Sequence, residues 1–179
     1  LAPPSSHLSE QSMSSNHLTF ALADTAATDA LGARLAALLE PGMRIYLEGD
    51  LGTGKTTLTR ALLRALGHKG PVKSPTYTLV EIYVFSRYIL YHFDFYRMNH
   101  PAEWLDAGLD EHFNADSVCV VEWPDKAGDT LPAPDLTVRL QFDAGSDGDK
   151  RKVDLAATSE RGERCLEVLR SMRHTTRAP

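Results

Sequence analysis

Cysteine is scarce in this sequence, with only Cys119 and Cys165 among 179 residues. Two cysteines cannot build the disulfide framework that stabilises many small secreted domains. Cys119 stands in an apolar run and is expected to be a small buried hydrophobic residue. No apolar run approaches the ~20 residues that span a bilayer, and no basic segment followed by an apolar one opens the chain. We therefore expect a cytoplasmic protein with neither membrane anchor nor signal peptide.

An excess of positive charge is also absent, since 19 basic residues face 24 acidic ones, a net charge of −5. This balance argues against nucleic acid as a direct partner. The clearest basic cluster, Lys150 to Lys152, is interpreted as a solvent-exposed hairpin turn. The seven histidines form no H-E-x-x-H pattern and have no C-x-x-C partner, so no zinc site is predicted.

Length and composition fit one folded domain, because 42% of the residues are hydrophobic. Residues 1–17 are rich in Ser and Pro and are expected to be a disordered extension, and 173–179 a loose tail, leaving 18–172 as the domain. Hydrophobic patterns predict strands at 18–22, 43–48, 72–85, 88–95, 117–123, 136–142 and 153–157. Helices are predicted from Thr28 or Asp29 to 39, and at 55–66, 101–113 and 159–172.

A glycine-rich loop follows the second predicted strand and fits G-x-x-x-x-G-K-[ST] completely. Its glycines let backbone N–H groups curl around phosphate oxygens, Lys55 supplies a cation, and Thr56 offers a hydroxyl to Mg²⁺. Thr57 is placed for the α-phosphate. The residues predicted to bind a nucleoside triphosphate are Gly49, Asp50, Leu51, Gly52, Thr53, Gly54, Lys55, Thr56 and Thr57. The fold class expected is therefore α/β: a single-domain P-loop NTPase with a central mixed parallel/antiparallel sheet flanked by helices.

Two acids stand at the ends of apolar strands, Asp94 after Y-I-L-Y-H-F and Glu122 after V-C-V-V. Open α/β sheets bind ligands at strand ends, and nucleotide hydrolysis needs an acid near the metal and a group that places the water. Either acid alone would be an ordinary solvated strand end. Both together, beside a complete phosphate loop, favour a catalytic function.

Several further side chains keep two interpretations each. A hydroxyl from Thr76 or Thr78 can sense the γ-phosphate, but the segment is also ordinary β-rich sequence. Arg97 can contact phosphate or pair with Asp94. His92 is interpreted as a core histidine, and Trp123 either as core or as an aromatic side chain beside the active site.

Four segments together, G-D-L-G-T-G-K-T-T, V-K-S-P-T-Y-T-L-V-E, Y-H-F-D-F-Y-R and V-V-E-W-P, resemble the bacterial TsaE (YjeE) family. The resemblance covers about Leu18 to Pro132. It implies a P-loop ATPase that uses ATP and Mg²⁺ and supports TsaD and TsaB in making threonylcarbamoyladenosine in tRNA. Contact with tRNA would be indirect, through that complex.

The resemblance also implies residue roles. Gly52 to Thr57 would hold the phosphates, and Thr56 and Glu122 would bind the Mg²⁺. Asp94 would be the essential acid and is also a candidate ligand of the Mg²⁺. Ser74, Pro75, Thr76 and Thr78 would form a switch-like loop that faces the γ-phosphate and the partner.

The expected chemistry is attack of water on the γ-phosphorus, with Lys55 as a catalytic cation and Asp94 or Glu122 orienting the water. The sequence does not separate those two roles. It shows no arginine finger, so we expect the isolated protein to hydrolyse ATP slowly and partner proteins to stimulate it. Arg97 or a residue of a partner can supply such an arginine. The alternatives are a small-molecule kinase and a non-hydrolysing, nucleotide-switched binding module. Adenine contacts are expected from Leu22 to Thr28, and the oligomeric state stays open.

Overall fold

The computed structural model describes residues 16–75, 77–145 and 148–175, with the side chains of 173–175 left out. The strands are β1 (His17–Leu22), β2 (Arg44–Glu48), β3 (Val80–Val84), β4 (Ile89–Asp94), β5 (Ser117–Glu122), β6 (Leu136–Phe142) and β7 (Arg151–Ala157). The α-helices are α1 (Thr25–Leu38), α2 (Lys55–Ala65), α3 (Glu103–Asp106) and α4 (Glu160–Thr175). Two 3₁₀ segments, η1 (Leu109–His112) and η2 (Pro124–Thr130), complete the described elements.

All the strands belong to a seven-stranded sheet in the order β1-β7-β6-β2-β5-β4-β3. The four central strands pair in parallel, β6 with β2, β2 with β5 and β5 with β4. The outer pairs β1–β7, β7–β6 and β4–β3 are antiparallel. The predicted α/β fold with a mixed sheet is thus confirmed.

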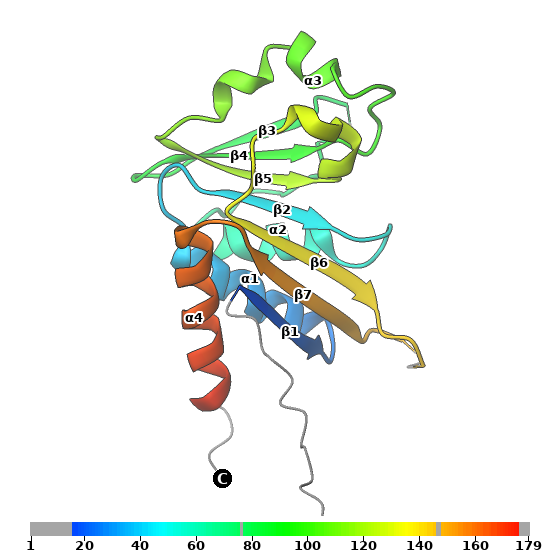
Figure 1. Cartoon of the computed structure of the whole chain (residues 1–179), viewed down its shortest axis with the longest axis vertical. Coiled ribbons are helices and arrows are strands. Elements are labelled where there is room, and N and C mark those ends of the chain that lie inside the picture. Colours follow the sequence, from blue (N-terminus) through cyan, green and yellow to red (C-terminus); the bar gives the residue numbers. More distant parts are fainter. Residues whose placement is uncertain (1–15, 76, 146–147, 176–179) are drawn as a thin grey trace, which may run out of the picture.

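Helices cover the two faces of the sheet unequally (Figure 1). α1, α2 and α4 pack on one face through a large apolar cluster that includes Leu35, Leu62 and Leu166. The short α3 lies on the other face, where Trp104 packs with Phe93 and Phe95. Both clusters bury the central strands, which explains why β5 reads as a continuous apolar run that ends in a charge.

The first helix begins earlier than predicted, so Thr28 and Asp29 are not its cap. Asp24 precedes Thr25 in extended conformation, and its carboxylate accepts a hydrogen bond from the N–H of Ala27 at 2.8 Å. Thr28 is instead buried inside the helix, at 4% exposure. The Ala-rich turn between them is a good helix former, which is why the earlier cap serves.

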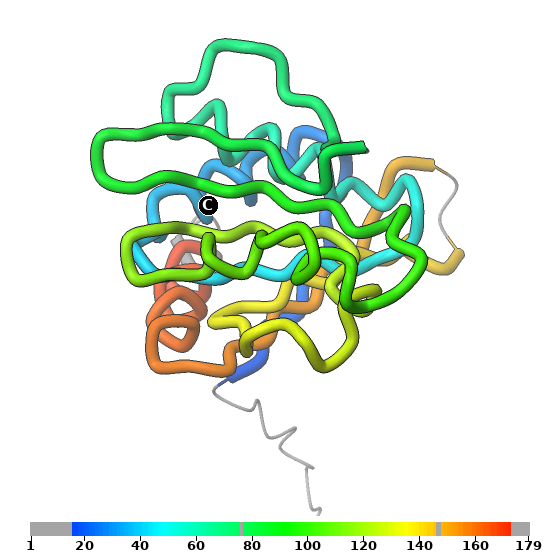
Figure 2. Tube along the Cα trace, turned by 90° about the horizontal axis from the view of Figure 1, so that it is seen from above, coloured from blue at the N-terminus to red at the C-terminus, as the bar shows by residue number. Residues whose placement is uncertain are grey.

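The helix predicted over 101–113 is wrong as a single element. Gly108 adopts a left-handed conformation, with φ of 71°, and separates α3 from η1. The strand predicted over 72–85 is also too long, because only Val80–Val84 pair with β4. Pro71 and Pro75 lack the N–H that a ladder needs, and Leu79 has a positive φ of 64°. Figure 2 shows the chain between α2 and β3 making a wide excursion before it returns to the sheet.

The boundaries at both ends differ slightly from the expected ones. β1 starts at His17, and α4 continues to Thr175. The hydroxyl of Ser159 accepts a hydrogen bond from the N–H of Gly162 at the start of α4. Residues 1–15 and 176–179, which hold most of the expected extension and tail, lie outside the described residues. Within the described part, no helix combines the length and apolar character needed to cross a bilayer.

Candidate functional site

Parallel pairing gathers the predicted site at one edge of the sheet. β2, β4 and β5 run in the same direction, so the glycine-rich loop after β2 meets Asp94 and Glu122, the last residues of β4 and β5. Asp94 and Glu122 are register partners, and Leu47 of β2 also lies opposite Glu122. The topology therefore brings together three segments that are far apart in the sequence.

The loop has the backbone shape that its glycines permit. Gly49, Gly52 and Gly54 all have positive φ, of 142°, 80° and 110°. A Cβ on Gly49 would lie 2.3 Å from the carbonyl oxygen of Leu140, so no other residue fits there. Gly54 precedes α2, and no side chain of the described residues caps the helix. Gly54, Lys55, Thr56 and Thr57 line an open pocket, so the first turn of α2 borders it.

Lys55 is a buried cation, with 5% exposure. Its ammonium donates hydrogen bonds to the carbonyls of Gly49 at 2.5 Å and Asp50 at 2.9 Å, and lies 4.4 Å from the ring centroid of Trp123. Burial lowers the pKa of Lys55 below its usual value, while the negative charges of Glu122 and Asp94 act in the opposite direction. The acids thus offset part of the effect of burial on the pKa of Lys55.

Glu122 links the loop to β4. The hydroxyl of Thr56 donates to its carboxylate, with both oxygens 3.2 Å away, and Nε2 of His92 lies 2.9 Å from its Oε1. Glu122 and His92 are buried, at 2% and 0% exposure. His92 is thus a core histidine, as interpreted, but it also orients a predicted site residue. Its spacing of two from Asp94 on one strand could have signalled this, because both side chains share a face.

Thr56 and Glu122 offer a convergent hydroxyl and carboxylate, which suits Mg²⁺. This ion takes one or two protein carboxylates and completes its shell with water and substrate phosphates. In the described part of the chain, no group of three or more His, Cys, Asp or Glu side chains could enclose a metal ion. The donor set present fits a magnesium ion that arrives with a nucleotide.

Asp94 is tied to the segment before β3. One of its carboxylate oxygens accepts the hydroxyl of Ser74, and the other accepts the N–H of Tyr96 at 3.0 Å. Thr78 donates to the carbonyl of Val80 at 3.1 Å and does not line the pocket. Pro75 is buried away from it. Thr76 lies outside the described residues. Of the predicted switch-like loop, Ser74 is the residue that the structure places at the site.

These side chains enclose a pocket of about 380 Å³. Its lining consists of Leu51, Gly52, Gly54, Lys55, Thr56, Thr57, Ser74, Asp94, Tyr96, Arg97, Glu122 and Trp123. Gly49, Asp50 and Thr53 belong to the loop but do not line this pocket. The Thr53 hydroxyl donates to the Asp50 carbonyl at 2.8 Å. Sequence reasoning did not select Tyr96, whose ring packs 4.9 Å from that of Trp123.

The structure decides part of what the sequence left open for Arg97 and Trp123. The Arg97 guanidinium lines the pocket and lies 5.0 Å from the ring of Tyr77, and in the described residues it forms no ion pair with Asp94. Trp123 is partly buried at the mouth of the pocket, in a left-handed backbone conformation with φ of 57°. The aromatic residue thus lies beside the site and also packs against the apolar cluster of Phe93 and Phe95.

The interpretation of Lys150 to Lys152 as an exposed turn is wrong for Arg151 and Lys152, which both belong to β7. Arg151 opens β7 rather than a turn, and its Nε donates to the carbonyl of Thr53 at 3.2 Å. Its guanidinium also lies 4.5 Å from the ring of Phe142. The pairing of β6 with β7 places this cation against the outside of the glycine-rich loop, which sequence spacing alone does not reveal.

Comparison with known proteins gives consistent similarities. The family described as threonylcarbamoyl adenosine biosynthesis protein TsaE matches residues 22–153. A "tRNA threonylcarbamoyladenosine biosynthesis protein TsaE" of Haemophilus influenzae is 43% identical over 72% of this chain and 79% of its own length. The protein of that name in Bacillus subtilis is 39% identical over 79% of this chain and 87% of its own length.

A solved structure agrees with the sequence comparisons. The crystal structure of YdiB from Bacillus subtilis superposes with a TM-score of 0.72 at 33% sequence identity, covering 89% of this chain and 96% of that one. The family match contains the glycine-rich loop and both strand-end acids. This chain therefore belongs to the TsaE family.

Proposed function

We propose that this chain is a Mg²⁺-dependent ATPase that supports a TsaB–TsaD complex in the threonylcarbamoyladenosine modification of tRNA. The observation that carries the proposal is the convergence of Lys55, Thr56, Asp94 and Glu122 on one pocket behind a complete phosphate-binding loop. The names of the relatives support the pathway, because they are described as tRNA threonylcarbamoyladenosine biosynthesis proteins. A tRNA would be reached through TsaB–TsaD rather than directly.

Different residues of the pocket bind the phosphates, bind Mg²⁺ and orient the attacking water. The loop N–H groups and Lys55 bind the phosphates and neutralise charge that develops on the γ-phosphoryl group. Thr56 and Glu122 hold Mg²⁺, whose contribution is to neutralise phosphate charge. Asp94 has one carboxylate oxygen fixed by Ser74 and the other by the Tyr96 N–H, which suits a group that orients the attacking water. Adenine contact by Leu22 to Thr28 remains a prediction; Thr28 lies closest to the loop, near Gly54.

Phosphate release from Mg-ATP tests the proposal, measured with and without purified TsaB–TsaD. We expect slow release by the chain alone and faster release with the complex, because no arginine finger is evident in the pocket beyond Arg97 among the described residues. Asp94→Asn and Glu122→Gln should lose most of the turnover while ATP affinity, measured by calorimetry, falls less. Asp106→Asn, an exposed acid on α3, is the matched control.

Three outcomes would contradict the proposal in different ways. Nucleotide binding without phosphate release, even with TsaB–TsaD present, would leave a nucleotide-switched binding module. A phosphorylated small molecule in place of free phosphate would indicate a kinase. Pull-down of TsaB–TsaD with ATP, with ADP and without nucleotide tests the partners separately, and failure in all three conditions would remove them.

A further inference from the structure

Arg151 contacts the phosphate-binding loop from its outer side, opposite the pocket. Its Nε donates to the carbonyl of Thr53 at 3.2 Å, and a terminal nitrogen donates to the carbonyl of Gly52 at 3.4 Å. The other terminal nitrogen donates to the carbonyls of Gly148 at 3.2 Å and Lys150 at 3.1 Å. The guanidinium thereby joins the loop to the segment that leads into β7.

We propose that Arg151 is a positioning residue of the nucleotide site, which holds the Gly52 and Thr53 carbonyls outward so that loop N–H groups face the phosphates. In a trans peptide the C=O and the N–H of one unit point in opposite directions. An outward carbonyl on Thr53 therefore turns the N–H of Gly54 inward, and Gly54 lines the pocket. The inference rests on the proposed nucleotide binding, and it assigns a function to a residue outside the four sequence segments quoted in the sequence analysis.

The loop needs such support because its backbone is unusually free. Glycine loses more conformational entropy on ordering than any other residue, and three of the residues between 49 and 54 are glycine. Around Gly52 an added Cβ would contact only the ring of Phe142, at 3.9 Å, so side-chain packing on that side comes from the hairpin of β6 and β7. Arg151 supplies directional hydrogen bonds that packing alone does not.

Strand register and an aromatic ring fix the position of the Arg151 guanidinium. Arg151 pairs in register with Phe142, and its charge lies 4.5 Å from that ring. Strand pairing therefore sets where Arg151 lies along the sheet, and the aromatic ring restricts the orientation of its side chain. A loop held in its binding geometry before the ligand arrives binds more tightly, because less ordering remains to be done on binding. The permanent positive charge adds to the attraction for phosphate.

The test compares Arg151→Met and Arg151→Lys with Lys152→Ala. Methionine keeps the apolar contact with Phe142 and removes the hydrogen bonds, whereas lysine keeps the charge. Lys152 is the neighbouring cation on β7, exposed and 3.9 Å from Asp154, without a contact to the loop in the described residues. Calorimetry measures the affinity for Mg-ADP and Mg-ATP, and hydrogen–deuterium exchange measures protection of residues 49–54 with Mg-ADP bound at a saturating concentration.

We expect Arg151→Met to lower the affinity for Mg-ADP and Mg-ATP about 10-fold each, to speed amide exchange in the nucleotide-bound loop, and to lower kcat at saturating ATP by less than it lowers the affinity. Arg151→Lys should recover part of the affinity, and Lys152→Ala should match the unaltered protein. Unchanged affinity and exchange in Arg151→Met, or a loss explained by a general drop in Tm, would overturn the inference alone. An unaltered protein that binds no Mg-ADP would overturn the proposed function and this inference with it.

Discussion

Buried polar side chains gather around the candidate site. Thr53, Lys55, His92, Asp94 and Glu122 are each at most 8% exposed. Burying polar and charged groups is unfavourable unless partners compensate, so their hydrogen bonds and opposite charges are needed for stability as well as for orientation. A change at one of these residues should therefore affect both properties, and experiments must measure them separately.

His92→Asn and His92→Phe test the role of the buried histidine. Removing Nε2 leaves the Glu122 carboxylate without its 2.9 Å partner, so the carboxylate is less well oriented toward Thr56. We expect the Mg²⁺ concentration for half-maximal ATP turnover to rise about 10-fold, as is typical when a supporting contact of a metal ligand is lost. Titration of Mg²⁺ at saturating ATP measures it, with exposed His100→Asn as control. An unchanged Mg²⁺ dependence at lowered Tm would assign His92 to stability alone.

Both thiols should be unreactive in the folded protein. Burial raises the pKa of Cys119 to about 12 and that of Cys165 to about 11, from a usual value of 9.0. The thiolate is the reactive form, so at pH 8 neither side chain should react with a thiol reagent such as Ellman's until the protein unfolds. Because the folded thiols keep their protons where unfolded ones lose them, the free energy of unfolding should also fall as the pH rises above about 9. Rapid native labelling of either residue would contradict this.

Helices and strands were predicted correctly from the sequence where a local pattern is compatible with only one secondary structure. Strand, glycine-rich loop and helix over 44–65 were predictable because the glycines, Lys55 and the apolar strand are all local. Prediction failed where the sequence offers more than one acceptable local option, as at the start of α1, where both Asp24 and Thr28 are suitable cap residues. Gly108 was a readable helix stop inside 101–113.

The residues of the candidate site also divide into those that local sequence predicts and those that depend on how the strands pair. Thr56, Asp94 and Glu122 could be placed from strand-end positions, since parallel strands align their carboxyl ends. The contacts of Arg151, which depend on how β7 pairs with β6, had no local signal. His92 had one in its spacing, but a histidine in an apolar strand is most simply a core residue.

Close packing of α1 on α2 depends on Gly32. A Cβ at this position would lie 2.7 Å from both the Ala61 side chain and the Leu58 carbonyl. Gly32→Ala should therefore destabilise the protein by about 1–3 kcal/mol, although alanine favours an isolated helix by ~1 kcal/mol over glycine. Thermal or urea unfolding measures the change, and Ala33→Ser on the exposed side of α1 is the control. Equal or higher stability would show that the two helices separate without loss.

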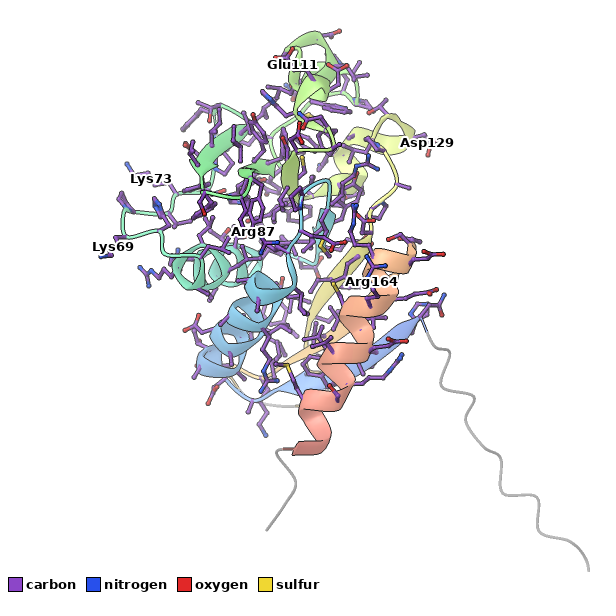
Figure 3. All side chains as sticks on the ribbon, turned by 90° about the vertical axis from the view of Figure 1, so that its left-hand side faces the viewer. Lys69, Lys73, Arg87, Glu111, Asp129 and Arg164 are labelled. Atoms are coloured by element: carbon purple, nitrogen blue, oxygen red, sulfur yellow. The ribbon has the colours of Figure 1, made fainter. Side chains whose placement is uncertain are left out.

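The whole molecule has an uneven distribution of charge. Between 56 and 80 the chain carries Arg60, Arg64, Lys69 and Lys73 and no carboxylate, whereas between 100 and 135 Lys126 is the lone Lys or Arg among acids. In Figure 3, Lys69 and Lys73 project from one side, and Glu111 and Asp129 lie away from them. Such separation orients a protein as it approaches a charged partner.

Charge reversal at Lys69 and Lys73 tests this orientation. Lys73 adjoins Ser74, whose segment is proposed to face the partner, so Lys69→Glu with Lys73→Glu should slow association with TsaB–TsaD about 10-fold at low salt. The difference should shrink at high salt, because screening weakens long-range attraction. Surface plasmon resonance measures the rates, and Arg164→Glu on α4 is the control. Identical association rates would exclude steering by this side of the molecule.

The pairing of β1 with β7 joins the first described strand to the last. A ribosome releases the chain from its N-terminus, so β1 emerges long before the strand that it needs. Until β7 has left the exit tunnel, β1 has no partner in the sheet, and the apolar side chains of Leu18 and Leu22 lack part of their cover. The sheet can therefore close only late in synthesis, and the early segment depends on chaperones or on its own solubility until then.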